Sequence, residues 1–124
     1  MTIWLIIGAL TLTILAGLHS YIGETRLLQQ LMTLSNLPIL EGSMNYTKAI
    51  LRWAWHLTSL AWVGFAGIFI ALTQIPLDAR PMVGIVLAGC LGLSAIIAFV
   101  ATRGRHLAWV FFLVSTVCAL LGTR

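Results

Sequence analysis

The amino-acid sequence predicts an all-α integral membrane protein, a four-helix bundle with a short interfacial amphipathic helix between the first and second membrane spans. The 124-residue chain is 60% hydrophobic and only 8% charged, with a mean hydropathy of +1.05. So few charged side chains cannot cover a soluble surface. The apolar residues also gather in long runs, and about 20 apolar residues are enough to cross the hydrocarbon core of a bilayer.

The predicted membrane spans belong to a single transmembrane domain, residues 1–124. They cover residues 2–23, 50–76, 81–102 and 105–123, of which the last is the shortest but still long enough to cross. The first run lacks a basic segment before it and a clear small-residue cleavage site, so we interpret it as a retained helix rather than a signal peptide. Pro81 is suited to the first turn of the third helix.

The connection between the first two spans, residues 24–49, contains a segment with helical periodicity. In "ETRLLQQLMTL" one side is apolar and the other polar, which is typical of a helix lying in the membrane interface. The apolar side holds Leu27, Leu28, Leu31, Met32 and Leu34. The following "SNLP" predicts the end of this helix, because the residue before a proline avoids helical angles. Ser43 or Asn45 is suited to cap the next helix, which we expect to begin before the membrane does.

Basic residues flank the spans unevenly. One side holds Arg26, Lys48, Arg52, Arg103 and Arg105, whereas the other holds Arg80 and Arg124. Because cytoplasmic connections are enriched in Lys and Arg, the pattern predicts a multi-pass protein with both termini outside. The net charge of +4 forms no basic face, which excludes a nucleic-acid-binding protein.

All three histidines lie toward the predicted cytoplasmic side: His19 near the end of the first span, His56 in the second and His106 at the start of the fourth. We expect Gly23 to end the first helix and let Glu24 turn back toward His19. Ionisable groups at membrane depth usually face the bundle interior, and imidazole with carboxylate suits zinc or ferrous iron. The pattern therefore predicts a divalent-metal site formed by His19, His56, His106 and Glu24. Alternatively, each histidine simply bonds a helix-end carbonyl or lies among headgroups.

The neighbouring arginines indicate other ligands for the same region. Arg52, Arg103 and Arg105 are candidates for holding an anionic ligand or the headgroup of a membrane lipid, because guanidinium groups match phosphate geometry. A quinone pocket is a further alternative. A haem held by two histidines is less favoured, because His106 lies too close to the interface for a haem ligand.

A stripe of small residues, Gly84, Ala88 and Gly92, follows the third span at four-residue spacing. Such stripes allow close helix packing in lipid. The stripe predicts packing within the bundle or, alternatively, docking of a second copy or of a larger membrane complex. The two cysteines, Cys90 and Cys118, lie inside apolar runs without metal-ligand spacing and are expected to be inert thiols.

Three segments, "GLHSYIGETRLL", "RWAWHLTSLAW" and "TRGRHLAWVFF", each contain one of the histidines. Through its HSxxGE, RWAWH and GRHLAW patterns the chain resembles a group of small four-helix bacterial membrane proteins. The segments cover about a third of the chain. The resemblance implies a bacterial inner-membrane location and no particular activity.

Two function hypotheses follow. The first is a small membrane metalloprotein that acts on a lipid-like or membrane-associated substrate, with Glu24 as a fourth metal ligand or a general base. The second is a non-catalytic accessory subunit of a larger membrane complex, which the stripe on the third span favours. Whether the protein is an enzyme therefore stays open at this point.

Overall fold

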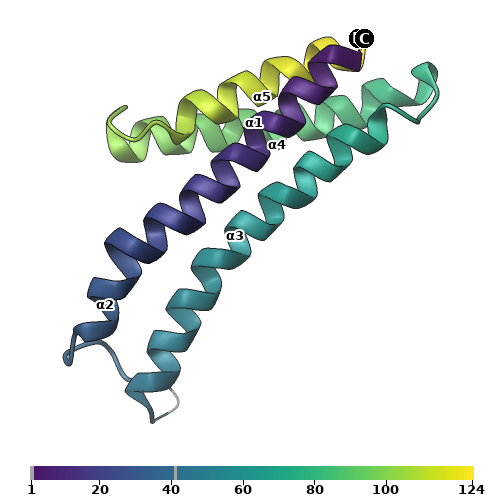
Figure 1. Cartoon of the computed structure of the whole chain (residues 1–124). Helices are drawn as coiled ribbons and strands as arrows, with labels where there is room; N and C mark the ends of the chain where they lie inside the picture. The colour runs from purple at the N-terminus through teal and green to yellow at the C-terminus, as the bar shows by residue number, and fades with distance from the viewer. Residues whose placement is uncertain (1, 41) are drawn as a thin grey trace.

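The computed structural model describes residues 2–40 and 42–124, and all regular structure in this part of the chain is helical (Figure 1). The elements are α1 (Thr2–Ile22), the π-helical segment η1 (Gly23–Leu28), α2 (Gln29–Thr33), α3 (Met44–Leu72), the 3-10 turn η2 (Leu77–Ala79), α4 (Arg80–Thr102) and α5 (Ala108–Gly122). The predicted all-α class is confirmed.

In the described part of the chain, three helical stretches are long and apolar enough to cross a membrane: Thr2–Thr33, Met44–Leu72 and Leu77–Thr102. Large apolar side chains are exposed along them, including Leu60, Met82 and Ile85. An exterior of this kind is typical of a lipid-facing surface, because soluble proteins rarely expose large contiguous apolar patches. These observations indicate a membrane protein.

Helix α5 is shorter than the predicted fourth span, 105–123. It begins at Ala108 and has 15 residues, a length of about 22 Å compared with about 30 Å for the hydrocarbon core. The late start has a local cause. Arg103 (φ 52°) and Gly104 (φ 74°) both adopt left-handed angles, and the Gly104 N–H donates to the Phe99 carbonyl at 2.8 Å. This C-terminal cap ends α4 and leaves residues 103–107 outside both helices.

The first helix does not end at Gly23 as predicted. Residues 2–33 form one continuous helical stretch, in which η1 and α2 extend α1 in the same direction (Figure 1). The N–H of Gln29 donates to the carbonyl of Glu24, which is the wider π-type bond between residues five apart. The separate interfacial helix predicted for residues 24–34 is therefore replaced by an extension of α1. Its predicted end is confirmed, because Leu34 is already extended.

The connection to α3 is held by side chains near the start of that helix. Ser43 caps α3 by accepting the N–H of Tyr46 at 3.4 Å, which confirms one of the two predicted caps. The Thr47 hydroxyl donates to the Pro38 carbonyl at 2.8 Å. The Lys48 ammonium donates to the Met32 carbonyl at 2.6 Å, where a cation is favoured by the helix C-terminus.

The α3–α4 turn differs slightly from the prediction. Helix α3 ends at Leu72 rather than near residue 76, and α4 begins at Arg80 with Pro81 in its first turn, as expected. The Arg80 guanidinium is buried and donates to the carbonyls of Ile75 at 2.7 Å and Thr73 at 3.2 Å. These bonds satisfy carbonyls released at the end of α3.

The helices pack as a series in which α3 contacts α1, α1 contacts α5 and α5 contacts α4. Figure 1 shows the start of α1, the end of α5 and the α3–α4 turn at one end of the molecule. The core lies toward that end, where Leu5, Leu12, Phe69 and Leu72 are fully buried. At the other end the α1–α3 pair diverges from the α4–α5 pair (Figure 1).

The small-residue stripe on α4 packs against α5. A Cβ on Gly84 would overlap the Thr123 side chain, and one on Gly92 would lie 3.5 Å from the Thr116 methyl group. Ala88 between them is buried. The stripe therefore forms a helix contact within the chain, which is the first of its two predicted roles.

Candidate functional site

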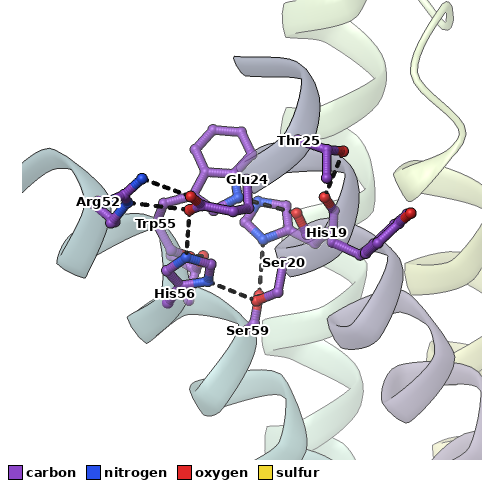
Figure 2. A network of polar contacts seen from close by, with 10 residues as sticks. His19, Ser20, Glu24, Thr25, Arg52, Trp55, His56 and Ser59 are labelled. Atoms are coloured by element: carbon purple, nitrogen blue, oxygen red, sulfur yellow. Dashed lines mark hydrogen bonds and ion pairs between the residues drawn. The ribbon is translucent and has the colours of Figure 1, made fainter. Parts of the chain in front are cut away.

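A carboxylate bound by an arginine and a histidine lies between η1 and α3 (Figure 2). The Arg52 guanidinium donates to both oxygens of Glu24, with Nη2–Oε1 at 2.6 Å and Nε–Oε2 at 3.2 Å. His56 Nε2 lies 3.2 Å from Oε2 of the same carboxylate. Bidentate, charge-assisted bonds of this kind hold a carboxylate in one orientation. Glu24 is therefore fixed in its ionised form between Arg52 and His56.

Two serines connect this pair to His19 (Figure 2). His56 Nδ1 is 3.0 Å from Ser20 Oγ, the Ser20 and Ser59 hydroxyl oxygens are 2.9 Å apart, and Ser59 Oγ is 2.9 Å from His19 Nδ1. Helical spacing explains the arrangement, because side chains three or four residues apart share a face. Ser20 and Glu24 are four apart on the first helix, and His56 and Ser59 are three apart on α3.

Two tryptophans of α3 fix the imidazole of His19. Trp55 stacks on it with ring centroids 4.3 Å apart and an interplanar angle of 3°, while Trp62 contacts it edge-on at 4.7 Å. The Trp55 indole also donates to the His19 carbonyl at 3.0 Å. This indole lies directly over Gly23, where a Cβ would overlap it. Gly23 thus allows the close approach that holds Trp55 and His19 in place.

A cavity of about 580 Å³ opens beside His19, where α1 diverges from α5. Its apolar lining comes from Leu15, Leu18, Ile22, Leu27, Leu107, Ala108 and Phe111, together with Trp55 and Gly23. Its polar groups are His19, Arg26, Arg105 and His106. Pockets for small ligands typically measure about 300–1,000 Å³ and combine an apolar wall with a few polar groups. The cavity meets both criteria.

The predicted metal site is not supported by this arrangement. Among residues 2–40 and 42–124, no group of three or more histidine, cysteine, aspartate or glutamate side chains is placed to hold a metal ion. Both ring nitrogens of His56 already take hydrogen bonds, and two serines separate His56 from His19. His106 lies outside α5, and its Nδ1 accepts the N–H of Ala108 at 3.2 Å.

The three arginines predicted to bind an anion lie in different surroundings. Arg105 lines the cavity, Arg52 is paired with Glu24, and Arg103 is exposed in the turn after α4. Arg26 takes a place at the cavity that the sequence did not predict. It was assigned to an interfacial helix, and only the continuation of α1 through the π turn brings it to the cavity.

Ser20, Ser59 and Trp55 were also missed as site residues. Ser20 follows His19 directly, and Ser59 is three residues after His56, so a search for hydroxyls on the histidine faces could have found both. Trp55 resembled an ordinary interfacial anchor, and no sequence signal separated its stacking role from anchoring.

Comparisons of the chain with family models, with curated proteins and with solved structures find no match.

Proposed function

We propose that this protein binds an anionic lipid-like amphiphile in the cavity between α1, α3 and the start of α5. The cavity itself is the observation that supports this function. It has an apolar wall long enough to cover part of an acyl chain. Its polar groups are the side chains of two arginines and two histidines. Within the described part of the chain, neither Arg26 nor Arg105 forms an ion pair, so both guanidinium groups remain free for a ligand.

The positive charges at the cavity favour a ligand with a negatively charged headgroup. Arg26 and Arg105 contribute two permanent positive charges, and a phosphate accepts bidentate bonds from guanidinium. The Glu24 carboxylate is already bound by Arg52 and His56. An anionic head is therefore favoured over a zwitterionic or cationic one.

The membrane setting is part of the proposal. We infer a multi-pass protein of the bacterial inner membrane, with the arginine-rich end in the cytoplasm, because Arg26, Lys48, Arg52, Arg103 and Arg105 belong to the same two connections and their flanks. The bound headgroup then lies at cytoplasmic headgroup level, where anionic lipids are available.

A lipid-binding measurement tests the function. The protein is reconstituted in nanodiscs of phosphatidylcholine containing a small fraction of phosphatidic acid, and the lipid retained is measured by native mass spectrometry. We expect selective retention of phosphatidic acid. Combining Arg26→Ala with Arg105→Ala weakens retention at least about tenfold, because each charge-assisted bond contributes roughly 1.5–3 kcal/mol. Ala108→Leu, which fills part of the cavity, also weakens it.

Arg103→Ala is the matched control, because Arg103 is an exposed arginine two residues from Arg105 that does not line the cavity. It should retain phosphatidic acid as the native protein does. Equal retention of phosphatidylcholine and phosphatidic acid, or equal loss in the control, would overturn the proposal.

One of the features that favour the accessory-subunit alternative, the stripe on α4, has a partner within the chain. The stripe of Gly84, Ala88 and Gly92 packs against α5 of the same chain and is not available to a partner in this structure.

A further inference from the structure

The side chains between His19 and Glu24 form an unbroken hydrogen-bonded series from the cavity to an ion pair (Figure 2). In order it runs from His19 Nδ1 through the Ser59 and Ser20 hydroxyls to His56 Nδ1, and from His56 Nε2 to Glu24. Its contacts measure between 2.9 and 3.2 Å. Each inner group is able both to donate and to accept, because a hydroxyl carries one proton and two lone pairs and an imidazole has two nitrogens.

The charge of His56 determines the direction of the three bonds that connect His56 to His19. Glu24 is held ionised by Arg52, so His56 Nε2 must donate to it. When His56 is neutral, its Nδ1 accepts from Ser20, Ser20 accepts from Ser59, and Ser59 accepts from His19 Nδ1–H. The remaining nitrogen of His19, Nε2, is then a lone-pair acceptor.

When His56 is an imidazolium, the three bonds between His56 and His19 are reversed, while Nε2 still donates to Glu24. Nδ1–H of His56 donates to Ser20, Ser20 donates to Ser59, and Ser59 donates to His19 Nδ1. His19 stays neutral, but its proton is now on Nε2. None of the hydrogen bonds formed by residues 2–40 and 42–124 uses this Nε2, and His19 lines the cavity.

We propose that His19, Ser59, Ser20 and His56 form a proton relay between the cavity and the Glu24–Arg52 pair. A proton given by an acidic group in the cavity binds His19 Nε2. The Nδ1 proton of His19 moves to Ser59, the Ser59 proton to Ser20, and the Ser20 proton to His56 Nδ1. One proton leaves the acid and one N–H bond forms on His56, whose positive charge is stabilised by Glu24. The role of the cavity ligand as proton donor rests on the proposed function.

The groups around the relay are compatible with this direction. His56 contacts the carboxylate of Glu24, which belongs to η1. Arg52, on the same helix as His56, binds the same carboxylate. His19 is enclosed by the neutral rings of Trp55 and Trp62 from α3. Arg26, Arg105 and His106 line the same cavity as His19, and their positive charges disfavour a lasting positive charge on His19. Within the described residues, His56 is thus the relay histidine that contacts a carboxylate, that of Glu24.

A titration of the ligand-free protein tests the relay. Histidine side chains are labelled with ¹⁵N, the protein is placed in phosphatidylcholine nanodiscs, and the ring nitrogens are followed by NMR as the pH falls. We expect His56 to become an imidazolium while His19 stays neutral and exchanges its Nδ1–H tautomer for Nε2–H at the same midpoint. In Ser59→Ala and in Ser20→Ala, His56 still titrates but the tautomer change of His19 at that midpoint is lost.

Thr58→Ala is the control, because Thr58 is an exposed hydroxyl on the same helix that bonds only the Trp55 carbonyl. This variant should keep the tautomer change of His19 at the His56 midpoint. His106→Gln assigns the NMR signals of the third histidine and removes no residue of the hydrogen-bonded series. A native protein in which His19 keeps its tautomer through the His56 midpoint overturns the relay. The relay is also overturned if the tautomer change of His19 persists in both Ser59→Ala and Ser20→Ala.

A second measurement separates the relay from ligand binding. With phosphatidic acid as the probe, we expect retention to increase about tenfold as the pH falls through the His56 midpoint, since His19 then donates to a charged headgroup. Ser59→Ala should keep binding at high pH and lose this increase. Absence of binding at every pH contradicts the proposed function alone, whereas an unchanged increase in Ser59→Ala contradicts the relay alone.

Discussion

Gly23 is the residue on which the geometry of His19 depends most. A side chain there would overlap the Trp55 indole, and this indole both stacks on His19 and donates to its carbonyl. The sequence prediction assigned Gly23 the role of helix terminator. The structure shows a helical glycine whose function is close approach, because the π turn continues the backbone hydrogen bonds without left-handed angles.

Replacing Gly23 with alanine should therefore displace Trp55. We expect Gly23→Ala to destabilise the fold by about 1–3 kcal/mol, the usual cost of overpacking, and to change the tryptophan fluorescence. Gly17→Ala is the matched variant on the same helical stretch, where a Cβ has no atom within 4 Å. It should be neutral or stabilising by up to about 1 kcal/mol. Denaturation in mixed micelles measures both variants, and equal effects would contradict the role of Gly23.

The histidines show how far single residues can be interpreted from sequence. Their common location toward one end was visible in the sequence, as was the presence of one carboxylate nearby. Their partners were not visible. Ser20 and Ser59 occupy the space between His19 and His56, and only the helix rotations decide that these two hydroxyls connect the two rings.

At the scale of elements, the α4–α5 pair shows a pattern that the sequence predicted correctly. Small residues at four-residue spacing face another helix, and the pair packs closely at Gly84 and Gly92. The partner could not be assigned from the stripe itself, because a smooth helix face is compatible with any apolar neighbour. The short turn 103–107, with its two left-handed residues, makes α5 that neighbour.

A bulky residue on this stripe should weaken the α4–α5 contact. We expect Gly84→Leu to destabilise the protein by about 1–3 kcal/mol through its overlap with Thr123. Gly89→Leu places the same side chain on the exposed side of α4, where a Cβ has no atom within 4 Å, and should have little effect. Unfolding in SDS followed by circular dichroism compares the two. Light scattering that shows a lower oligomeric state for Gly84→Leu with unchanged stability would favour docking of a second copy instead.

The first helix shows where element prediction failed. Residues 24–34 have an amphipathic pattern, but this pattern does not determine whether the segment is separate from α1 or continuous with it. Gly23 and "SNLP" were both interpreted as breaks, and only the second ends the helix. As a consequence Arg26 lies at the cavity rather than in a peripheral helix.

At the scale of the whole molecule, the paired helices place both connections with basic residues away from the two chain ends (Figure 1). This arrangement agrees with the distribution of arginines along the sequence. It also separates the molecule into a closely packed end, around Leu5 and Phe69, and an end that diverges around the cavity.

The inferred orientation is tested by cysteine labelling. A membrane-impermeant maleimide should react with Thr2→Cys in intact spheroplasts and with Ser35→Cys in inside-out vesicles, because both positions are exposed at opposite ends of the molecule. The native chain is the background control, since Cys90 and Cys118 lie within the apolar helices α4 and α5. Labelling of Thr2→Cys in inside-out vesicles and of Ser35→Cys in spheroplasts would show the opposite topology. The headgroup in the cavity would then lie outside the cytoplasm.

The sequence by itself determined the all-α class, the approximate spans, the cap at Ser43, the helix start at Pro81 and the concentration of histidines and arginines toward one end. These features depend on composition and on local periodicity, which act within a few residues. The tertiary structure alone decided which side chains meet. The π turn at Gly23 and the divergence of α1 from α5 set the rotation and spacing of the helices, and these determine that His19 faces a cavity with Arg26 and Arg105 while two serines join it to His56 and Glu24.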